Sequence, residues 1–366
     1  MINHVSVLEI NLKALEYNFN FFKSKLRNKT KIMAVVKAFA YGLEAVAIAK
    51  KLEKIKAAYL AVAYLKEAIE IKNAGVNLPI LILHPQIEEF DTIINLNLEP
   101  NIYNKKGLDA FLDLATKKKL KNYPIHLKFN TGLNRLGFDS AKAQAVFAQV
   151  KGNKNIKVVS VFSHLAASED LKEASFTKHQ IKKFNSIISI AKKTLPYKPL
   201  YHLLNTSGVI NYPEAQFDMV RIGIGMYGFA NETKITKKLK PVGVLKSKIS
   251  QIHQIKAGES VGYNRAYFAK TNLVTATIPI GHADGISRQL GNGNGYVYIN
   301  NKKAFIIGNV CMDMLMVAIT AIECKEGDTV VIYKDQEHIE NLAKLQGSIS
   351  YELLTAISQR VNRKII

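Results

Sequence analysis

Residues 32–42 read IMAVVKAFAYG and join a short apolar run to a charged residue. The run 32–36 has the length and composition of a buried β-strand, and Lys37 follows it directly. Because an unpaired ammonium group is costly to bury, a lysine at this place needs a partner or a chemical task. A desolvated lysine loses its proton readily and can then condense with an aldehyde. A surface lysine after an ordinary strand is the alternative that this stretch alone leaves open.

The same strand-then-helix pattern repeats along the first two thirds of the chain. Segments such as 43–56, 65–73 and 176–193 have apolar residues at helical spacing and separate short apolar runs. The runs predicted to be strands are 32–36, 58–62, 79–83, 98–102, 125–129, 158–163, 200–204 and 218–222. This alternation predicts an α/β fold, a closed parallel (β/α)8 barrel of the TIM type. An open doubly wound sheet is the alternative, but no dinucleotide-binding glycine fingerprint follows the first strand.

The chain changes character after about residue 232. Strand-like runs separated by turn residues then follow at 245–255, 273–280, 296–299, 304–307, 314–319 and 329–333. We therefore expect a barrel domain over residues 1–232 and a mainly β domain over residues 233–366, with the first residues as candidates for pairing with the second domain. The glycine-rich segment 291–295 is interpreted as a hairpin turn and not as a phosphate loop, because no helix follows it.

The composition favours a cytoplasmic protein without membrane or nucleic-acid partners. Of its 366 residues 48% are hydrophobic, which is enough for a large core, but no apolar stretch could span a bilayer and no signal peptide is recognised. Two cysteines, Cys311 and Cys324, indicate no disulfide framework. The net charge of +22 raises the question of a polyanionic partner, but no nucleic-acid motif accompanies the scattered lysines, so solvated helix faces are favoured.

Polar residues follow several predicted barrel strands, at the end where enzymes of this architecture place their chemistry. They are Lys37 and Tyr41 after the first strand, Arg135 after the fifth, His164 after the sixth, Asn205 and Thr206 after the seventh, and Arg221, Gly223 and Ile224 at the eighth. The last loops of such barrels commonly bind phosphate, which Thr206 and the N–H groups near Gly223 and Ile224 can do here.

Each of these polar residues also has a purely structural interpretation. His164 can be a hydrogen-bonded core histidine. Arg135 can form a surface ion pair with Asp139, and Arg221 can form one with Asp218. Their convergence on one rim of the predicted barrel favours a shared function.

The motifs resemble those of alanine racemases, which are barrel-type enzymes that depend on pyridoxal 5'-phosphate. The resemblance covers essentially the whole chain and rests on AVVKAFAYG (34–42), NTGLNRLGF (130–138), MVRIGIGMYG (219–228), VGYNRAY (261–267), NVCMDM (309–314) and YELLTAISQRV (351–361). It implies an isomerase that interconverts L-alanine and D-alanine and supplies D-alanine for cell-wall peptidoglycan. A racemase of serine or of broader specificity is the alternative, and a barrel-type amino-acid decarboxylase is a more distant one.

The resemblance also implies a role for each matching residue. Lys37 is implied to carry the cofactor as a Schiff base, His164 to lie against its ring and Arg221 to face the ring nitrogen. The residues implied to bind the phosphate are Tyr41, Thr206, Gly223, Ile224 and Tyr351. Arg135 and Met312 are implied to contact the substrate, and no metal site is predicted.

The resemblance further implies a reaction shared between two chains. Inversion at the α carbon requires one base on each face of the cofactor, and Lys37 and Tyr263 are implied to be those bases. Tyr263 lies in the second domain, which in this family completes the barrel site of the partner in a homodimer. Lys128 corresponds to a lysine that carries a carbamate in some members. His282 replaces the tyrosine usual in IPIGYADG, and this smaller gate residue would admit larger amino acids.

Overall fold

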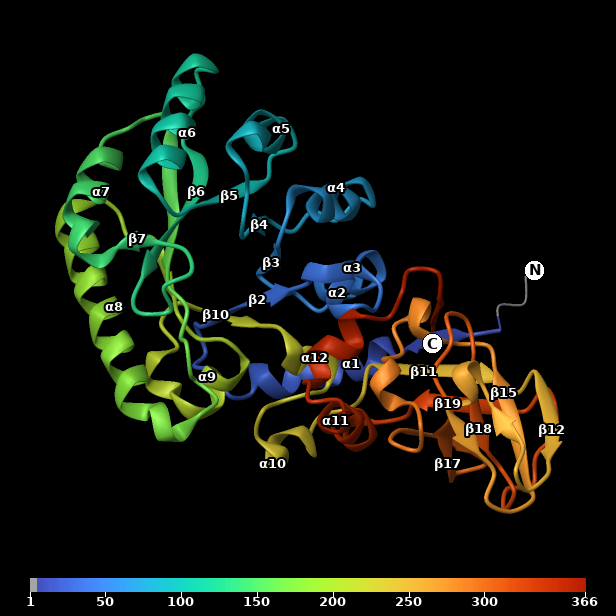
Figure 1. Ribbon diagram of the computed structural model, residues 1–366. Helices are drawn as coiled ribbons and strands as arrows, with labels where there is room; N and C mark the ends of the chain where they lie inside the picture. The colour runs from blue at the N-terminus through green and yellow to red at the C-terminus, as the bar shows by residue number, and fades with distance from the viewer. Residues whose placement is uncertain (1–4) are drawn as a thin grey trace.

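A closed parallel barrel forms the first part of the computed structural model, which describes residues 5–366 (Figure 1). Its strands are β2 (Lys31–Val35), β3 (Tyr59–Val62), β4 (Ile80–Ile82), β5 (Glu99–Ile102), β6 (Tyr123–Asn130), β8 (Ile156–Phe162), β9 (Leu200–His202) and β10 (Met219–Ile222). All are parallel to their neighbours, and the β10–β2 and β5–β6 pairs close the ring. The predicted (β/α)8 barrel is confirmed, and each of the runs predicted to be barrel strands forms one.

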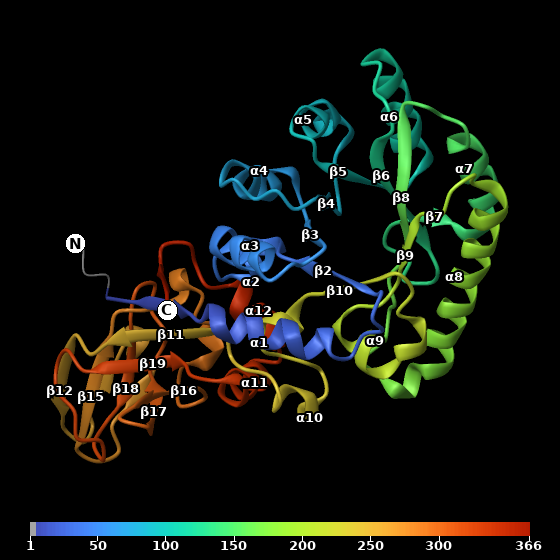
Figure 2. The ribbon, with the colours of Figure 1, turned by 180° about the vertical axis from the view of Figure 1, so that it is seen from behind.

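Helices cover the outside of the barrel; the first of them precedes the first barrel strand, and the others follow the strands along the chain (Figure 2). They include α1 (Leu12–Lys23), α3 (Ala45–Lys54), α4 (Leu65–Asn73), α5 (Phe90–Asn95), α6 (Lys105–Lys117), α7 (Ala143–Val150), α8 (Ala174–Thr194) and α9 (Thr206–Asn211). In α6 the side chain of Asn104 accepts from the Gly107 N–H at the N-terminus, and Leu108, Phe111 and Ala115 are buried at helical spacing. Burial of one such apolar face therefore sets how each helix packs on the barrel.

The second part is a nine-stranded sheet that includes both ends of the described chain. Its order is β12 (Gln251–Ile255), β15 (Leu273–Ile278), β18 (Leu315–Ala318), β17 (Lys302–Ile307), β16 (Tyr296–Ile299), β19 (Thr329–Tyr333), β11 (Gly243–Lys248), β1 (Val7–Ile10) and β20 (Asn362–Ile365). Strand β1 pairs antiparallel with β11 and parallel with β20. The chain thus begins in the second sheet before it enters the barrel.

Two details of the second part differ from the sequence prediction. The run 245–255 is not one strand, because the chain turns at residues 249–250 and places β11 and β12 far apart in the sheet order. The segment 291–295 is not a hairpin turn, because β16 pairs with β17 and β19 and not with β15. Instead, Asn292 and Gly293 have left-handed backbone angles and donate to the carbonyls of Gly308 and Ile306.

Helices α11 (Gln336–Leu345) and α12 (Ser350–Thr355) connect the second part to the barrel mouth, where α12 lies beside α2 (Lys37–Tyr41) (Figure 1). No residue with a Cβ could replace Gly42 there, because that Cβ would lie 1.9 Å from the Leu354 carbonyl oxygen. A domain boundary after residue 232 falls between β10 and β11 and stays a prediction, and residues 1–4 of the predicted barrel domain lie outside the described residues. Within residues 5–366, no helix has the length and apolar character needed to cross a membrane.

Candidate active site

A cavity of about 500 Å³ lies at the carboxyl ends of the barrel strands. The predicted site residues that line it are Lys37, Tyr41, Arg135, His164, Thr206, Arg221, Gly223, Ile224 and Tyr351. Lys128 lines it as well, and no Asp or Glu is present among the described lining residues. A cavity with several basic groups and no carboxylate favours an anionic ligand.

Lys37 begins a left-handed helical turn. The φ angles of Ala38, Phe39, Ala40 and Tyr41 lie between 52° and 59°, and the turn ends at Gly42 with a φ of 83°. Left-handed backbone costs roughly 1–2 kcal/mol for each residue that carries a Cβ, so surrounding contacts must hold this turn in place. The turn brings both Lys37 and Tyr41 to the cavity from adjoining positions.

The carboxylate of Glu67 holds the start of this turn. It accepts hydrogen bonds from the N–H groups of Ala38 at 2.5 Å, Ala63 at 2.7 Å and Tyr64 at 3.1 Å. Its negative charge also favours the protonated form of the Lys37 amine. Burial and the nearby Arg135 lower the pKa of Lys37, and Glu67 raises it. Glu67 was not predicted from the sequence, since a glutamate in a helical segment is ordinarily a solvated residue.

Hydroxyl and N–H donors gather at one corner of the cavity, around Gly223. The Thr206 hydroxyl accepts from the N–H groups of Gly223 at 3.3 Å and Gly225 at 3.4 Å. A Cβ on Gly223 would lie 2.3 Å from the Tyr41 hydroxyl oxygen, so only glycine allows this approach. Burial raises the pKa of both Tyr41 and Tyr351, which therefore stay protonated donors at neutral pH. This donor set fits a phosphate group.

Arg221 is buried on β10 and is fixed by its neighbours. Its NH2 group donates to the carbonyls of Ser163 at 2.7 Å and Leu203 at 3.0 Å and to Nδ1 of His164 at 3.0 Å. Its NH1 group donates to Nδ1 of His202 at 2.8 Å. Burial and Arg135 lower the pKa of Arg221 to about 9, so it remains a cation at neutral pH.

The surface ion pairs considered for the two arginines are absent from the described structure. Asp218 pairs with Lys198 at 2.6 Å, and Arg221 is held by the contacts above. Asp139 accepts from the Ala141 N–H, and no ion pair joins it to Arg135. His164 lines the cavity, and burial and Arg221 lower its pKa well below the ordinary value. It is therefore neutral at physiological pH.

Lys128 is the most strongly perturbed amine at the cavity. It is only 6% exposed, and burial together with the charges of Arg221, Arg135 and Lys37 lowers its pKa to about 7. A large part of Lys128 is therefore neutral at physiological pH, which is the form that reacts with carbon dioxide.

The stability of the protein is expected to depend on the ionisation of Lys128. Because its folded-state pKa of about 7 lies below the unfolded value of 10.5, the unfolded chain binds more protons between these two pH values, and stability rises with pH there. In carbon dioxide-free buffer and without cofactor, we expect the free energy of unfolding of the native protein to rise by about 2 kcal/mol more than that of Lys128→Met between pH 7 and 9. Urea unfolding of both proteins at the two pH values measures this change. A stability difference between the two proteins that is the same at pH 7 and pH 9 would contradict the prediction.

Tyr263 and Met312 do not line the cavity of their own chain. Their side chains are 71% and 59% exposed on loops of the second part. The Asn309 side chain joins the two loops by donating to the Tyr263 carbonyl at 3.1 Å. His282 is exposed too, and it lines a separate hollow together with Glu352 and not the main cavity. The structure therefore gathers nine of the predicted site residues and leaves these second-domain residues on the surface.

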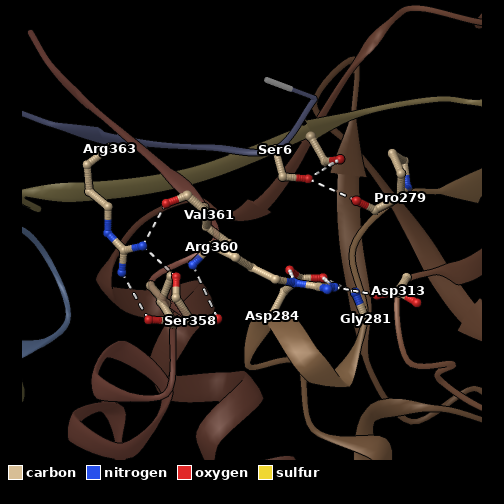
Figure 3. Close-up of polar contacts among 11 residues, drawn as sticks. Ser6, Pro279, Gly281, Asp284, Asp313, Ser358, Arg360, Val361 and Arg363 are labelled. Carbon is tan, nitrogen blue, oxygen red and sulfur yellow. Dashed lines mark hydrogen bonds and ion pairs between the residues drawn. The ribbon is translucent and has the colours of Figure 1, made fainter. Parts of the chain in front are cut away.

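Arg360 fixes the relative position of the loops that carry His282 and Met312 (Figure 3). Its guanidinium donates to the Asp284 carboxylate at 2.6 and 3.0 Å and to the Asp313 carboxylate at 2.6 Å. Asp284 is 6% exposed and closes its own loop by accepting from the Gly281 N–H. These contacts hold the two exposed loops in one fixed arrangement.

Comparison with known proteins identifies similar chains over the whole length. The family model described as alanine racemase, N-terminal domain, matches residues 10–231, and the one described as alanine racemase, C-terminal domain, matches residues 242–365. The alanine racemase of Treponema denticola is 37% identical and the alignment covers 98% of this chain and 97% of that one.

Solved structures are similar as well. An alanine racemase from Clostridium difficile 630 has a TM-score of 0.93 at 31% identity, covering 100% of this chain and 97% of that one. The alanine racemase of Bartonella henselae, solved with covalently bound pyridoxal phosphate, has a TM-score of 0.90 at 28% identity, with 100% of each chain covered. The likeness thus extends through both parts of the fold.

Proposed function

Because the chain belongs to the alanine racemase family, we propose that it interconverts L-alanine and D-alanine with Lys37 and Tyr263 as its two bases. The chain is an amino-acid racemase, and its cofactor is pyridoxal 5'-phosphate. The observation that carries the proposal is the convergence of Lys37, Arg135 and Arg221 with a phosphate-type donor corner on one cavity at the barrel mouth.

The lining residues divide into those that hold the phosphate and those that hold the ring. When bound, pyridoxal phosphate supplies an aldehyde that reacts with amines and a ring that stabilises negative charge on the adjoining carbon. Tyr41, Thr206 and Tyr351 would donate to its phosphate. Lys37 would hold its reactive carbon, and Arg221 would face its ring nitrogen.

Arg221 has N–H groups left for this task. Its contacts with the protein use NH2 and one proton of NH1, so the second NH1 proton and Nε–H remain free of described partners. Arginine keeps its proton, so it donates a hydrogen bond to a ring nitrogen without protonating it. A ring held in this way would withdraw less charge, which would favour protonation of the α carbon over protonation of the aldehyde carbon. This supports racemisation over transamination.

Lys37 suits the role of base on one face. Its pKa is lowered by burial and by Arg135, so the neutral amine is more accessible at physiological pH than in a free lysine. Its place on the rigid left-handed turn fixes the direction from which it reaches the cavity. Arg135, on the rim, would bind the substrate carboxylate.

Tyr263 requires a second chain to act on this cavity. We propose a homodimer in which Tyr263 and Met312 of each chain reach the barrel mouth of the other. The support is their high exposure, their absence from the cavity of their own chain, and the fixed shape of the loops that carry them. A cytoplasmic role in supplying D-alanine for peptidoglycan rests on the family resemblance.

Incubation of the purified protein with L-alanine, L-serine or L-lysine in deuterated water tests the proposed reaction. Inversion of L-alanine with deuterium at the α carbon, at the highest kcat/KM of the three, is the expected result. Faster turnover of serine or lysine would favour the broader specificity that His282 implies. Release of carbon dioxide without inversion would contradict the proposal and favour a decarboxylase.

A further inference from the structure

A chain of buried hydrogen bonds crosses five neighbouring barrel strands and ends at Arg221. Glu99 on β5 is 8% exposed, and His126 on β6, Ser160 on β8 and His202 on β9 are fully buried. Glu99 Oε2 lies 2.7 Å from His126 Nε2, and His126 Nδ1 lies 2.5 Å from the Ser160 oxygen. The Ser160 oxygen lies 2.9 Å from His202 Nε2, and His202 Nδ1 lies 2.8 Å from Arg221 NH1.

The two ends of this chain, an arginine and a carboxylate, together set the direction of every bond. Arginine only donates, so His202 Nδ1 must be bare, and its proton must be on Nε2. That Nε2–H donates to Ser160, whose own hydroxyl proton is then free for His126 Nδ1. His126 Nδ1 is therefore also bare, and its Nε2–H donates to Glu99. A carboxylate only accepts, so the carboxylate end requires the same direction as the arginine end.

Packing around the chain supports a neutral His202 imidazole of fixed orientation. The His202 ring stacks on Phe162 with centroids 4.6 Å apart and planes at 6°, and the Arg221 guanidinium lies over the same Phe162 ring at 5.3 Å. Burial and the Arg221 charge lower the pKa of His202 well below its ordinary value. Tyr59 lies edge-on to His126 with centroids 5.8 Å apart and contacts Glu99 with its hydroxyl.

We propose that Glu99 and Ser160 are positioning residues: acting through His126 and His202, they fix the Nε2–H tautomer of His202 and thereby orient the Arg221 guanidinium. The bare Nδ1 of His202 holds one NH1 proton of Arg221, which leaves the other NH1 proton directed at a set place in the cavity. The connection to the ring nitrogen rests on the role proposed above for Arg221. The His202 tautomer does not depend on that role, because it follows from the hydrogen bonds alone.

The first test measures the tautomer in the unmodified protein. Long-range 15N–1H NMR of histidine-labelled protein separates protonated from bare ring nitrogens, and single His→Gln variants assign the signals of the nine histidines. We expect His202 and His126 both to be protonated on Nε2 and bare on Nδ1, with and without cofactor. A His202 protonated on Nδ1, or on both nitrogens, overturns the proposal. Neither result depends on catalysis.

The second test breaks the chain at Ser160. Ser160→Ala removes the acceptor for His202 Nε2–H, and we expect the His202 15N signals to shift and the dissociation constant of pyridoxal phosphate, followed by absorbance, to rise about tenfold. Ser247→Ala is the matched control, because Ser247 is a buried serine of the second sheet whose hydroxyl bonds Ser6. Equal His202 signals and cofactor affinity in the two variants would overturn the proposal.

Glu99→Met tests the far end of the chain. Without its acceptor, the His126 proton can move to Nδ1, and Ser160 can then donate to His202 Nε2, which competes with the tautomer that Arg221 requires. We expect a changed tautomer at His126, shifted 15N signals at His202 as its two tautomers become mixed, and cofactor affinity about tenfold weaker. Unchanged 15N signals of His202 would show that Glu99 and His126 form an isolated pair, and would overturn the role proposed for Glu99. If Glu99→Met does not fold, Ser160→Ala and the unmodified protein still decide.

Discussion

Replacement of Lys37 by alanine is expected to reduce kcat for racemisation about 10³-fold or more. The variant loses both the amine that would hold the cofactor and the base on one face of the substrate. A coupled assay of D-alanine formation measures the loss. Lys37→Arg is expected to be equally inactive, because arginine keeps the charge but cannot give up its proton.

Two comparisons make this result specific to the amine. Lys31 is an exposed lysine at the other end of the same strand, and Lys31→Ala is expected to keep the native rate. Added methylamine is expected to restore part of the activity of Lys37→Ala, because a small amine can enter the space that the side chain leaves. A Lys37→Ala variant with more than about a tenth of the native kcat would contradict the assignment.

Mixed dimers of Lys37→Ala and Tyr263→Phe chains are expected to recover activity that neither variant has alone. If Tyr263 serves the partner's cavity, a mixed dimer has one site with both changes and one intact site. Random assembly makes about half of the dimers mixed, so about a quarter of the native activity should return. Co-expression with two affinity tags isolates the mixed dimers for assay.

The opposite arrangement gives a different outcome in the same experiment. If each Tyr263 acted on the Lys37 of its own chain, both sites of the mixed dimer would lack one base, and no activity would return. Tyr17→Phe is a suitable control partner in place of Tyr263→Phe, because its exposed phenol lies on α1 and does not line the cavity. Mixed dimers of Lys37→Ala and Tyr17→Phe chains should then keep about half of the native rate, because one of their two sites is intact.

The barrel could be predicted because its strands are short, apolar and evenly separated by helical segments. The site residues on the barrel could be placed as well, since parallel strands bring their carboxyl ends to one rim. In this way Lys37, Thr206 and Arg221 meet at one cavity although they are far apart in the sequence. The assignment of their roles came from the resemblance and stays a prediction.

The features that could not be predicted depend on contacts between distant segments. Nothing in KAFAY indicates four successive left-handed residues, because alanine and phenylalanine ordinarily avoid that conformation, and Glu67 stabilises it from another helix. His202 and Glu99 sit in short buried strands, where a polar residue has no periodic signature. The run 245–255 has the pattern of one strand, because only the tertiary pairing separates β11 from β12.

Reduction with sodium borohydride in the presence of pyridoxal phosphate, followed by digestion and mass spectrometry, tests the central claim most directly. This treatment makes the attachment of the cofactor to an amine permanent, so the modified residue can be read from the peptide. We expect the added mass on the peptide that contains Lys37 and on no other. A modification at Lys128 or any other lysine instead, or no modification at all, would contradict it.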